Sequence, residues 1–166
     1  MRNNKKYFLK IPTYYLLPTT YYLMFTVCCL LFFGCALPRI VVLDDPLSPE
    51  EHLNLGVSYE KKGELDNALK EYQGASGKLP VAYLFMGNIY FQKKEYDEAE
   101  TNYKKAIKKD ENNADAYNNL AWLYYTKKEK LDEAEKLALK AMELNPAKKD
   151  IYQDTIDKVR GLKISQ

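Results

Sequence analysis

The sequence predicts an all-α protein whose main part is a small helical solenoid, and two observations predict it. A pattern of an aromatic or His residue, a large aliphatic residue, a small residue and a Tyr occurs three times in the 166 residues. Each copy is followed by a second block that ends in Asp-Asn-Ala or Asp-Glu-Ala. The small residues of the three copies, Gly56, Gly87 and Ala121, lie 31 and 34 residues apart. Self-similarity at a period of about 20 to 50 residues is typical of stacked helical hairpins.

Each repeat is expected to form two helices. In the second block, small and aromatic residues recur at i, i+4 and i+7, as in Ala68, Tyr72 and Ala75, which places them on one helical face. We expect the small residue of each first helix to pack against the Ala that begins this series, with the Tyr rings between neighbouring helix pairs. The expected helices span 49–62, 65–77, 80–93, 96–109, 114–127, 131–144 and 148–162.

Residues that begin and end helices support these boundaries. Ser48 precedes a Pro at the first helical position and a Glu three residues on, which is the pattern of a capping box. Gly63 is suited to end the first helix in a left-handed conformation. Asn113, Pro80 and Pro146 mark further boundaries.

The repeated positions resemble the signature of the tetratricopeptide repeat family. The resemblance implies three helix-turn-helix repeats over residues 48–146, at about 48–79, 80–113 and 114–147. The amphipathic stretch that follows, 148–166, resembles the capping helix and tail with which such arrays cover their last apolar face. Proteins of this family act by presenting surface to other proteins.

Residues 1–34 differ in composition from the repeats. A basic start leads into an uncharged run of 28 residues, 11–38, whose apolar core is typical of an export signal or an N-terminal anchor helix. The run contains Gly34-Cys35, which resembles the lipobox of bacterial lipoproteins, where the Cys becomes lipidated. Cleavage there leaves Cys35 as the only Cys of the mature chain. We expect a lipoprotein signal peptide, with an uncleaved single-pass inner-membrane anchor as the alternative.

Both alternatives place the repeats outside the cytoplasm, on a tether at residues 35–47. The expected localisation is therefore the cell envelope, as a membrane-anchored lipoprotein. The tether contains the apolar run 40–43, which is a candidate to dock on the solenoid or on a partner.

The charge balance argues against nucleic acid as a partner. The four bases that precede Cys35 are lost with the leader and no acids are, so the net charge changes from +2 to −2. Lys pairs recur at the ends of the first helices, as in Lys93-Lys94. They are better explained as complements to helix dipoles than as a basic ridge for phosphates.

Motifs for catalysis, cofactors and metals are missing from the sequence. His52 is the only His and stands at a packing position of the repeat. There is no Gly-rich phosphate loop, metal-spaced Cys/His cluster or nucleophile elbow. We expect no enzymatic activity, no cofactor and no metal, although a carboxylate pair assembled only in three dimensions stays open as an alternative.

The resemblance implies that the first helices line a concave groove that binds the partner. The expected groove residues, one step round from the packing face, are Leu53, Val57, Glu60, Leu84, Asn88, Phe91, Asn118, Trp122 and Tyr125. Trp122, the only Trp, is the best candidate for a binding hot spot, with packing between first helices as the alternative role. Relatives that grip chaperone C-termini carry Lys, Asn and Arg at positions that here hold Leu53, Val57, Phe85, Asp115 and Asn119. Chaperone-tail binding is therefore not expected.

These features predict a membrane-tethered adaptor or assembly factor. Its expected partners are one or more envelope proteins or peptide segments bound in the groove, together with the membrane at the N-terminus. The alternative function is a surface-exposed adhesin or ligand-binding lipoprotein.

Overall fold

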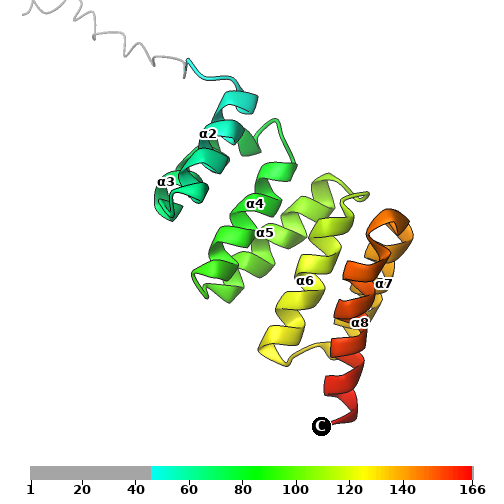
Figure 1. The fold of residues 1–166 in the computed structure, drawn as a ribbon. Helices are drawn as coiled ribbons and strands as arrows, with labels where there is room; N and C mark the ends of the chain where they lie inside the picture. The colour runs from blue at the N-terminus through cyan, green and yellow to red at the C-terminus, as the bar shows by residue number, and fades with distance from the viewer. Residues whose placement is uncertain (1–45, 166) are drawn as a thin grey trace, which may run out of the picture. The chain divides into compact units, whose positions relative to one another are not determined.

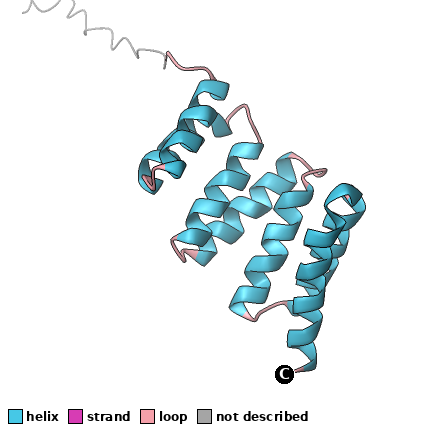
Figure 2. Ribbon diagram, in the orientation of Figure 1, coloured by secondary structure: helices cyan, strands magenta, loops and turns pink. Residues whose placement is uncertain are grey.

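The structure, a computed structural model, describes residues 46–165, and all regular secondary structure in that range is helical (Figure 2). The elements are α2 (Pro49–Lys61), α3 (Leu65–Ser76), α4 (Val81–Gln92), α5 (Tyr96–Lys109), α6 (Ala114–Lys127), α7 (Leu131–Leu144), the short 3-10 turn η2 (Pro146–Lys148) and α8 (Lys149–Ile164). The signal or anchor helix, Cys35 and the apolar run of the tether lie outside the described residues.

The helices pack in chain order as three hairpins (Figure 1). α2 packs on α3, α4 on α5 and α6 on α7, and neighbouring hairpins meet where α3 contacts α4 and α5 contacts α6. The last helix, α8, contacts both α6 and α7. The all-α solenoid of three repeats with a C-terminal helix is confirmed, and every expected helix is present with its ends within two residues of those expected.

Local sequence explains where the first helix begins and ends. The Ser48 side chain accepts a hydrogen bond from the Glu51 N–H at 3.2 Å, and the Glu51 carboxylate accepts one from the Ser48 N–H at 2.7 Å. Gly63 follows α2 at φ +77°. Lys94 and Lys128 hold the equivalent place after α4 and α6, at φ 63° and 57°, although a side chain strains this conformation.

A Tyr ring packs over a Gly within each of the first two repeats. A Cβ atom at Gly56 would lie 2.5 Å from the Tyr72 ring, and one at Gly87 would lie 2.5 Å from the Tyr103 ring. Both rings are buried. The atoms nearest to these positions are therefore those of the Tyr rings, a contact that the expected packing against the first alanines does not include. The missing side chain leaves room for a flat ring that begins one turn further along the second helix.

The third repeat uses a different pair at this place. Ala121 replaces the Gly and Ala138 replaces the Tyr, and both are fully buried. They share one apolar cluster with Ile156 and Val159 of α8. The last helix thus supplies apolar volume to the only repeat that lacks the ring.

The last helix takes the place that the first helix of a fourth repeat would occupy. Lys163 of α8 pairs with Asp132 at 2.6 Å, as Lys127 pairs with Asp97 at 3.0 Å. Asp66 and Lys93 form the same pair between the first two repeats, at 2.9 Å. These lysines therefore bridge neighbouring repeats, a role that the dipole explanation does not include.

The α8 helix ends the array because its outer side is polar. Asp157 of α8 stands six residues before Lys163. Gly87 and Ala121 stand at the same distance before Lys93 and Lys127. Asp157 is exposed. The buried residues of α8 are Tyr152, Thr155, Ile156 and Val159. This helix covers the apolar side of the third repeat as a cap does, and its own exposed side is mostly polar apart from Ile151 and Ile164.

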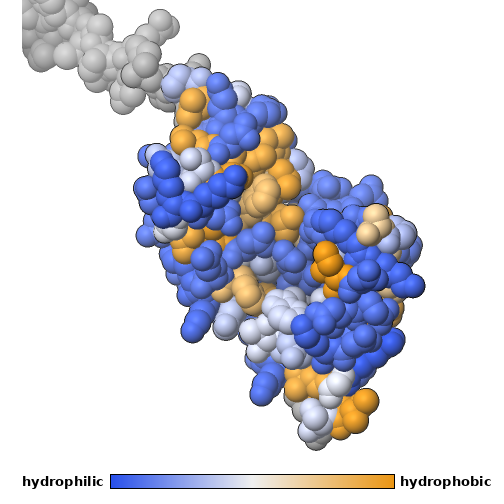
Figure 3. All heavy atoms as spheres, in the orientation of Figure 1, coloured by the Kyte–Doolittle hydropathy of each residue, from blue (hydrophilic) through white to orange (hydrophobic). Residues whose placement is uncertain are grey.

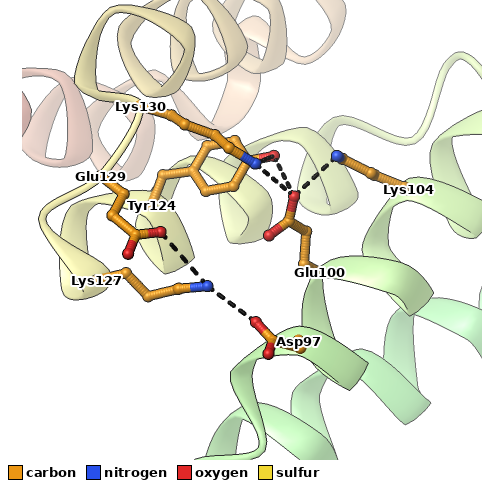
Figure 4. Close-up of polar contacts among 7 residues, drawn as sticks. All are labelled: Asp97, Glu100, Lys104, Tyr124, Lys127, Glu129 and Lys130. Atoms are coloured by element: carbon orange, nitrogen blue, oxygen red, sulfur yellow. Dashed lines mark hydrogen bonds and ion pairs between the residues drawn. The ribbon is translucent and has the colours of Figure 1, made fainter.

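A polar cluster around Glu100 joins the second repeat to the third (Figure 4). Its carboxylate oxygen accepts hydrogen bonds from Lys104 at 2.8 Å, Lys130 at 2.8 Å and the Tyr124 hydroxyl at 2.9 Å. Burial alone would raise the pKa of Glu100, but these three bonds outweigh it and lower the pKa to about 2. Glu100 is therefore ionised at neutral pH and holds α5 to α6 and to the start of α7.

Candidate partner-binding groove

Two of the nine predicted groove residues are buried. Leu84 and Asn118 are 6% and 8% exposed, so the expectation that they line an open surface is wrong. Leu84 belongs to the same apolar cluster as Leu120 and Ala121, because α4 contacts α6 directly. The Asn118 Oδ1 atom is buried and has no hydrogen-bond partner among residues 46–165. Neither side chain offers surface to a partner.

The α2 part of the predicted groove is occupied by contacts within the first two repeats. Leu53 and Val57 are half-buried against the cluster that contains Tyr72. The Glu60 carboxylate accepts a hydrogen bond from the Tyr72 hydroxyl at 2.6 Å. Burial, followed by this bond, raises the pKa of Tyr72, so the hydroxyl stays a donor. The first repeat therefore contributes to the predicted groove only half-buried apolar atoms and a carboxylate that already accepts a hydrogen bond.

A pocket of about 220 Å³ opens where α4, α5 and α6 meet. We call it the junction pocket, and its lining residues are Asn88, Phe91, Tyr103, Asn119 and Trp122. Three of the five belong to the predicted groove, so the structure brings these three together. The sequence prediction misses the other two, Tyr103 and Asn119.

The floor of the junction pocket is a pair of amides. Asn88 Oδ1 accepts hydrogen bonds from the Tyr103 hydroxyl at 3.0 Å and from Asn119 Nδ2 at 2.8 Å. Burial raises the pKa of Tyr103, which keeps its hydroxyl protonated. Within the described part of the chain, Asn88 Nδ2 and Asn119 Oδ1 form no hydrogen bond. The hydrogen-bonding capacity that remains on the pair is three N–H donors, two on Asn88 and one on Asn119, and the Asn119 carbonyl oxygen.

Aromatic rings form the walls of the junction pocket. Phe91 packs on Tyr96 with ring centroids 5.6 Å apart, and Trp122 packs on Tyr125 at 5.0 Å. Lys158 of α8 places its Nζ atom 4.8 Å from the centre of the Trp122 ring. Its ammonium group also pairs with Asp154 at 2.7 Å. The last helix therefore contacts one of the residues that line the pocket, as well as capping the core.

Other residues singled out in the sequence have structural roles. His52 is 8% exposed, and its Nδ1 atom lies 2.7 Å from the Glu71 carboxylate. A Cβ atom at Gly74 would lie 3.0 Å from the His52 ring, so this Gly provides room for it. None of the helices at residues 46–165 is long and apolar enough to cross a membrane.

The surface around these sites is mixed. On the face drawn in Figure 3 hydrophilic residues predominate, and the largest group of hydrophobic residues lies over the α2 to α4 part of the array. Apolar surface therefore reaches solvent beside the first helices, where the predicted groove begins.

Comparison with known proteins supports the repeat assignment. One family model, described as TPR repeat, matches residues 87–128, and another, described as Tetratricopeptide repeat, matches residues 113–145. A curated human protein, Tetratricopeptide repeat protein 6, is 40% identical over 63 residues. That match covers 36% of this chain and only 12% of the relative's length.

Solved structures share the fold. PcrH from Pseudomonas aeruginosa has a TM-score of 0.65 at 20% identity, with 72% of this chain and 99% of that chain covered. The TPR2B domain of yeast Sti1, solved in a pHsp70 complex, has a TM-score of 0.64 at 21% identity, with 68% of this chain and 96% of that chain covered. The first TPR of Spaghetti (RPAP3), bound to the HSP90 peptide SRMEEVD, has a TM-score of 0.63 at 23% identity, with 72% of this chain and 98% of that chain covered. The two family models thus match tetratricopeptide repeats within residues 87–145, and the solved structures show that the chain shares the fold of tetratricopeptide repeat domains.

Proposed function

We propose that this protein is a non-catalytic adaptor that binds a peptide segment of another protein across its first helices. The junction pocket carries the proposal. It combines two aromatic rings with amide N–H donors and one amide oxygen that no described residue uses. Aromatic side chains beside convergent polar groups are the features that mark protein-binding hot spots.

The similar structures support a peptide as the ligand class. Two of them are complexes named for pHsp70 and for an HSP90 peptide, although their identity to this chain is 21% and 23%. The chaperone tail itself is a poor candidate here. Asp115, at one position of the carboxylate clamp, is an acid that already accepts hydrogen bonds from Lys148 at 2.7 Å and Tyr152 at 2.9 Å. A second carboxylate beside it would be repelled.

The finer part of the proposal is a membrane-tethered role in the bacterial cell envelope. It rests on the apolar N-terminal run and on Gly34-Cys35, both outside the described residues. Cells grown with labelled palmitate should label the wild-type chain and not Cys35→Ser. Equal labelling of both would leave an uncleaved anchor as the better explanation.

Capture of partners tests the binding surface. Wild-type full-length chain, Phe91→Ala and a control, Leu139→Ala, would be used to retain proteins from envelope extracts. Leu139 is a 38% exposed apolar residue of α7, away from the pocket lining. Truncating a hot-spot residue costs about 2 kcal/mol or more, so Phe91→Ala should lower capture at least tenfold. Equal capture by Phe91→Ala and Leu139→Ala, with equal helicity by circular dichroism, would exclude the pocket as the binding site.

A further inference from the structure

We infer that the junction pocket receives an aromatic side chain of the bound peptide segment, and that this ring supplies the aromatic group that Phe85 supplies between the first and second repeats. The inference rests on the proposed function and names the chemistry of the partner. It follows from a comparison of two equivalent places in the chain, and from the lining, the charge and the size of the pocket.

The chain itself fills the space beside the buried Tyr ring between the first and second repeats. There Phe85 of α4 stacks on Tyr72 of α3, with ring centroids 5.2 Å apart and planes 21° apart. Asn119 of α6 stands at the position equivalent to Phe85, two residues before the small residue of its repeat. Its short amide side chain does not replace the ring, and the junction pocket opens beside it. An aromatic side chain from a partner would provide the contact that the chain lacks at this place.

The lining of the junction pocket suits an aromatic ring. Three of its five residues are aromatic, namely Phe91, Tyr103 and Trp122. Tyr103 is 2% exposed, so the partly exposed rings of Phe91 and Trp122 provide most of the accessible contact. Aromatic rings attract one another in offset-stacked or edge-to-face arrangements, beyond the gain from burying apolar area. A ring therefore gains more in this pocket than an aliphatic side chain of the same size.

The pocket continues the packed interface between the second and third repeats. Tyr103 lines the pocket and also belongs to the apolar cluster that contains Leu120 of α6. The α5 helix contacts α6 along this interface. A ring in the pocket would therefore extend an apolar contact region that already exists within the chain.

The charge of the pocket matches a neutral side chain. None of its lining residues is Lys, Arg, Asp or Glu. A carboxylate in the pocket would lose its water without gaining an opposite charge. Ring faces attract cations, but Trp122 already has the Lys158 ammonium 4.8 Å from its ring centre. A second ammonium at this ring would be repelled by the first.

The size of the pocket fits one ring. Its volume is about 220 Å³, and an apolar cavity of about 150 Å³ is enough to bind benzene. The volume lies below the range of about 300 to 1,000 Å³ that is usual for small-molecule sites. Aromatic side chains also lose little conformational entropy on binding, because few of their bonds rotate. One aromatic side chain of a longer segment is therefore favoured over a separate small molecule.

Mixtures of short synthetic peptides test this inference on the immobilised full-length chain. The mixtures share random flanking residues without aromatic side chains and differ in one central residue, which is Phe, cyclohexylalanine, Leu, Lys or Glu. Cyclohexylalanine is close to Phe in size but has no aromatic ring, so it separates aromatic contact from apolar area. We expect retention of the Phe mixture to exceed that of the cyclohexylalanine and Leu mixtures by about two- to tenfold. The Lys and Glu mixtures should be retained least.

A variant that fills the pocket from within the chain provides the second arm. Asn119→Phe should remove the preference for the Phe mixture. Asn119→Leu, which fills the same space, replaces it if Asn119→Phe fails to reach wild-type helicity. The matched control is Asn54→Phe, because Asn54 stands at the same repeat position in α2 and is exposed. This control should keep the wild-type preference.

Several results would overturn the inference. They are equal retention of the Phe, cyclohexylalanine and Leu mixtures, stronger retention of the Lys or Glu mixture, no retention of any mixture, and a Phe preference that persists when residue 119 fills the pocket. Self-association of the wild type in analytical ultracentrifugation that Asn119→Phe abolishes would assign the pocket to a second copy of the chain and would also overturn it. The adaptor function is judged separately, by capture of envelope proteins with Phe91→Ala and Leu139→Ala. Capture that still depends on Phe91 would leave the adaptor function intact when the aromatic preference fails.

Discussion

The two junctions between repeats are built alike and differ in what covers the Tyr ring. Between the first and second repeats, Phe85 stacks on Tyr72 with ring centroids 5.2 Å apart and planes 21° apart. Between the second and third repeats, the position of Phe85 is held by Asn119, which bonds Asn88 beside Tyr103. The first junction is closed by a ring, and the second contains the junction pocket.

This difference shows that the Gly and Tyr residues build the fold, whereas a different residue decides whether a pocket forms. Both of the first two repeats keep a Gly and Tyr pair between their own two helices, and the Tyr of each pair also faces the next repeat. A single position on the next first helix, Phe85 or Asn119, then decides whether the space beside the ring is filled. The junction pocket is thus a local change in a packing scheme that is repeated within this chain.

The largest expected effect is the loss of either ring. Tyr72→Ala and Tyr103→Ala should each lower the free energy of unfolding by about 3–5 kcal/mol, because a buried aromatic side chain leaves a cavity. Tyr72→Ala should cost about 0.5–1.5 kcal/mol more, since only Tyr72 loses a stacked partner. Urea unfolding followed by circular dichroism measures both. An equal cost, or a larger one for Tyr103→Ala, would contradict the difference between the junctions.

A methyl group beside the Tyr ring of the second repeat should have the next largest effect. Gly87→Ala places a carbon about 2.5 Å from the Tyr103 ring and should cost about 1–3 kcal/mol. In a Tyr103→Ala background this cost should vanish. The double variant then has the same pair of residues as Ala121 and Ala138 in the third repeat. Gly161→Ala is the control, since no atom lies within 4 Å of its added Cβ. It should stabilise α8 by up to about 1 kcal/mol. A cost for Gly87→Ala that is the same in both backgrounds would refute the ring contact.

The turns that follow the first helices differ in a smaller way. Gly63 and Lys94 both have positive φ, at 77° and 63°, but only the Gly adopts it without steric cost. Lys94→Gly should therefore stabilise the protein by about 1 kcal/mol or less, after the added flexibility of the unfolded chain is subtracted. Thermal unfolding of Lys94→Gly and Gly63→Ala should shift in opposite directions. A lower melting temperature for Lys94→Gly would show that its side chain, and not the turn, matters.

The polar sides of the two junctions predict a difference in pH dependence. Leu69 stands in the first junction where Glu100 stands in the second. The pKa of Glu100 is lowered from 4.5 to about 2, so its contribution to stability is complete above pH 4.5 and is lost as the pH falls toward 2. Glu100→Gln should make the free energy of unfolding less dependent on pH in that window. The control Glu111→Gln, at an exposed residue, should not. Identical profiles for the two variants would count against the Glu100 cluster.

The helices were predictable because their determinants are local and repeated. Apolar spacing, the Ser48 capping box and Gly63 act within a few residues, so one sequence shows them directly. Asn88, Phe91 and Trp122 line one pocket because they lie on one face of the first helices, and the helical spacing shows that face directly.

The rest depended on how neighbouring hairpins are rotated. Asn118 and Asn119 are adjacent in sequence and about 100° apart around α6, and only the structure shows that Asn119 faces the pocket. The repeat pattern predicts packing for the Tyr rings, but the partner of the Tyr103 hydroxyl lies 15 residues away on another helix. The Glu100 contact with Lys130 joins residues 30 apart in the chain. The lipid at Cys35 and the envelope localisation stay predictions.

The fluorescence of Trp122 tests the central claim most directly, because it is the only Trp of the chain and lines the junction pocket. A captured partner, titrated into the full-length protein, should change the emission of wild type in a saturable way. Asn119→Phe, which gives the second junction the residue of the first, should keep its helicity and abolish both binding and the emission change. Binding of the partner with equal affinity to both proteins, and with Trp122 emission unchanged, would contradict the account.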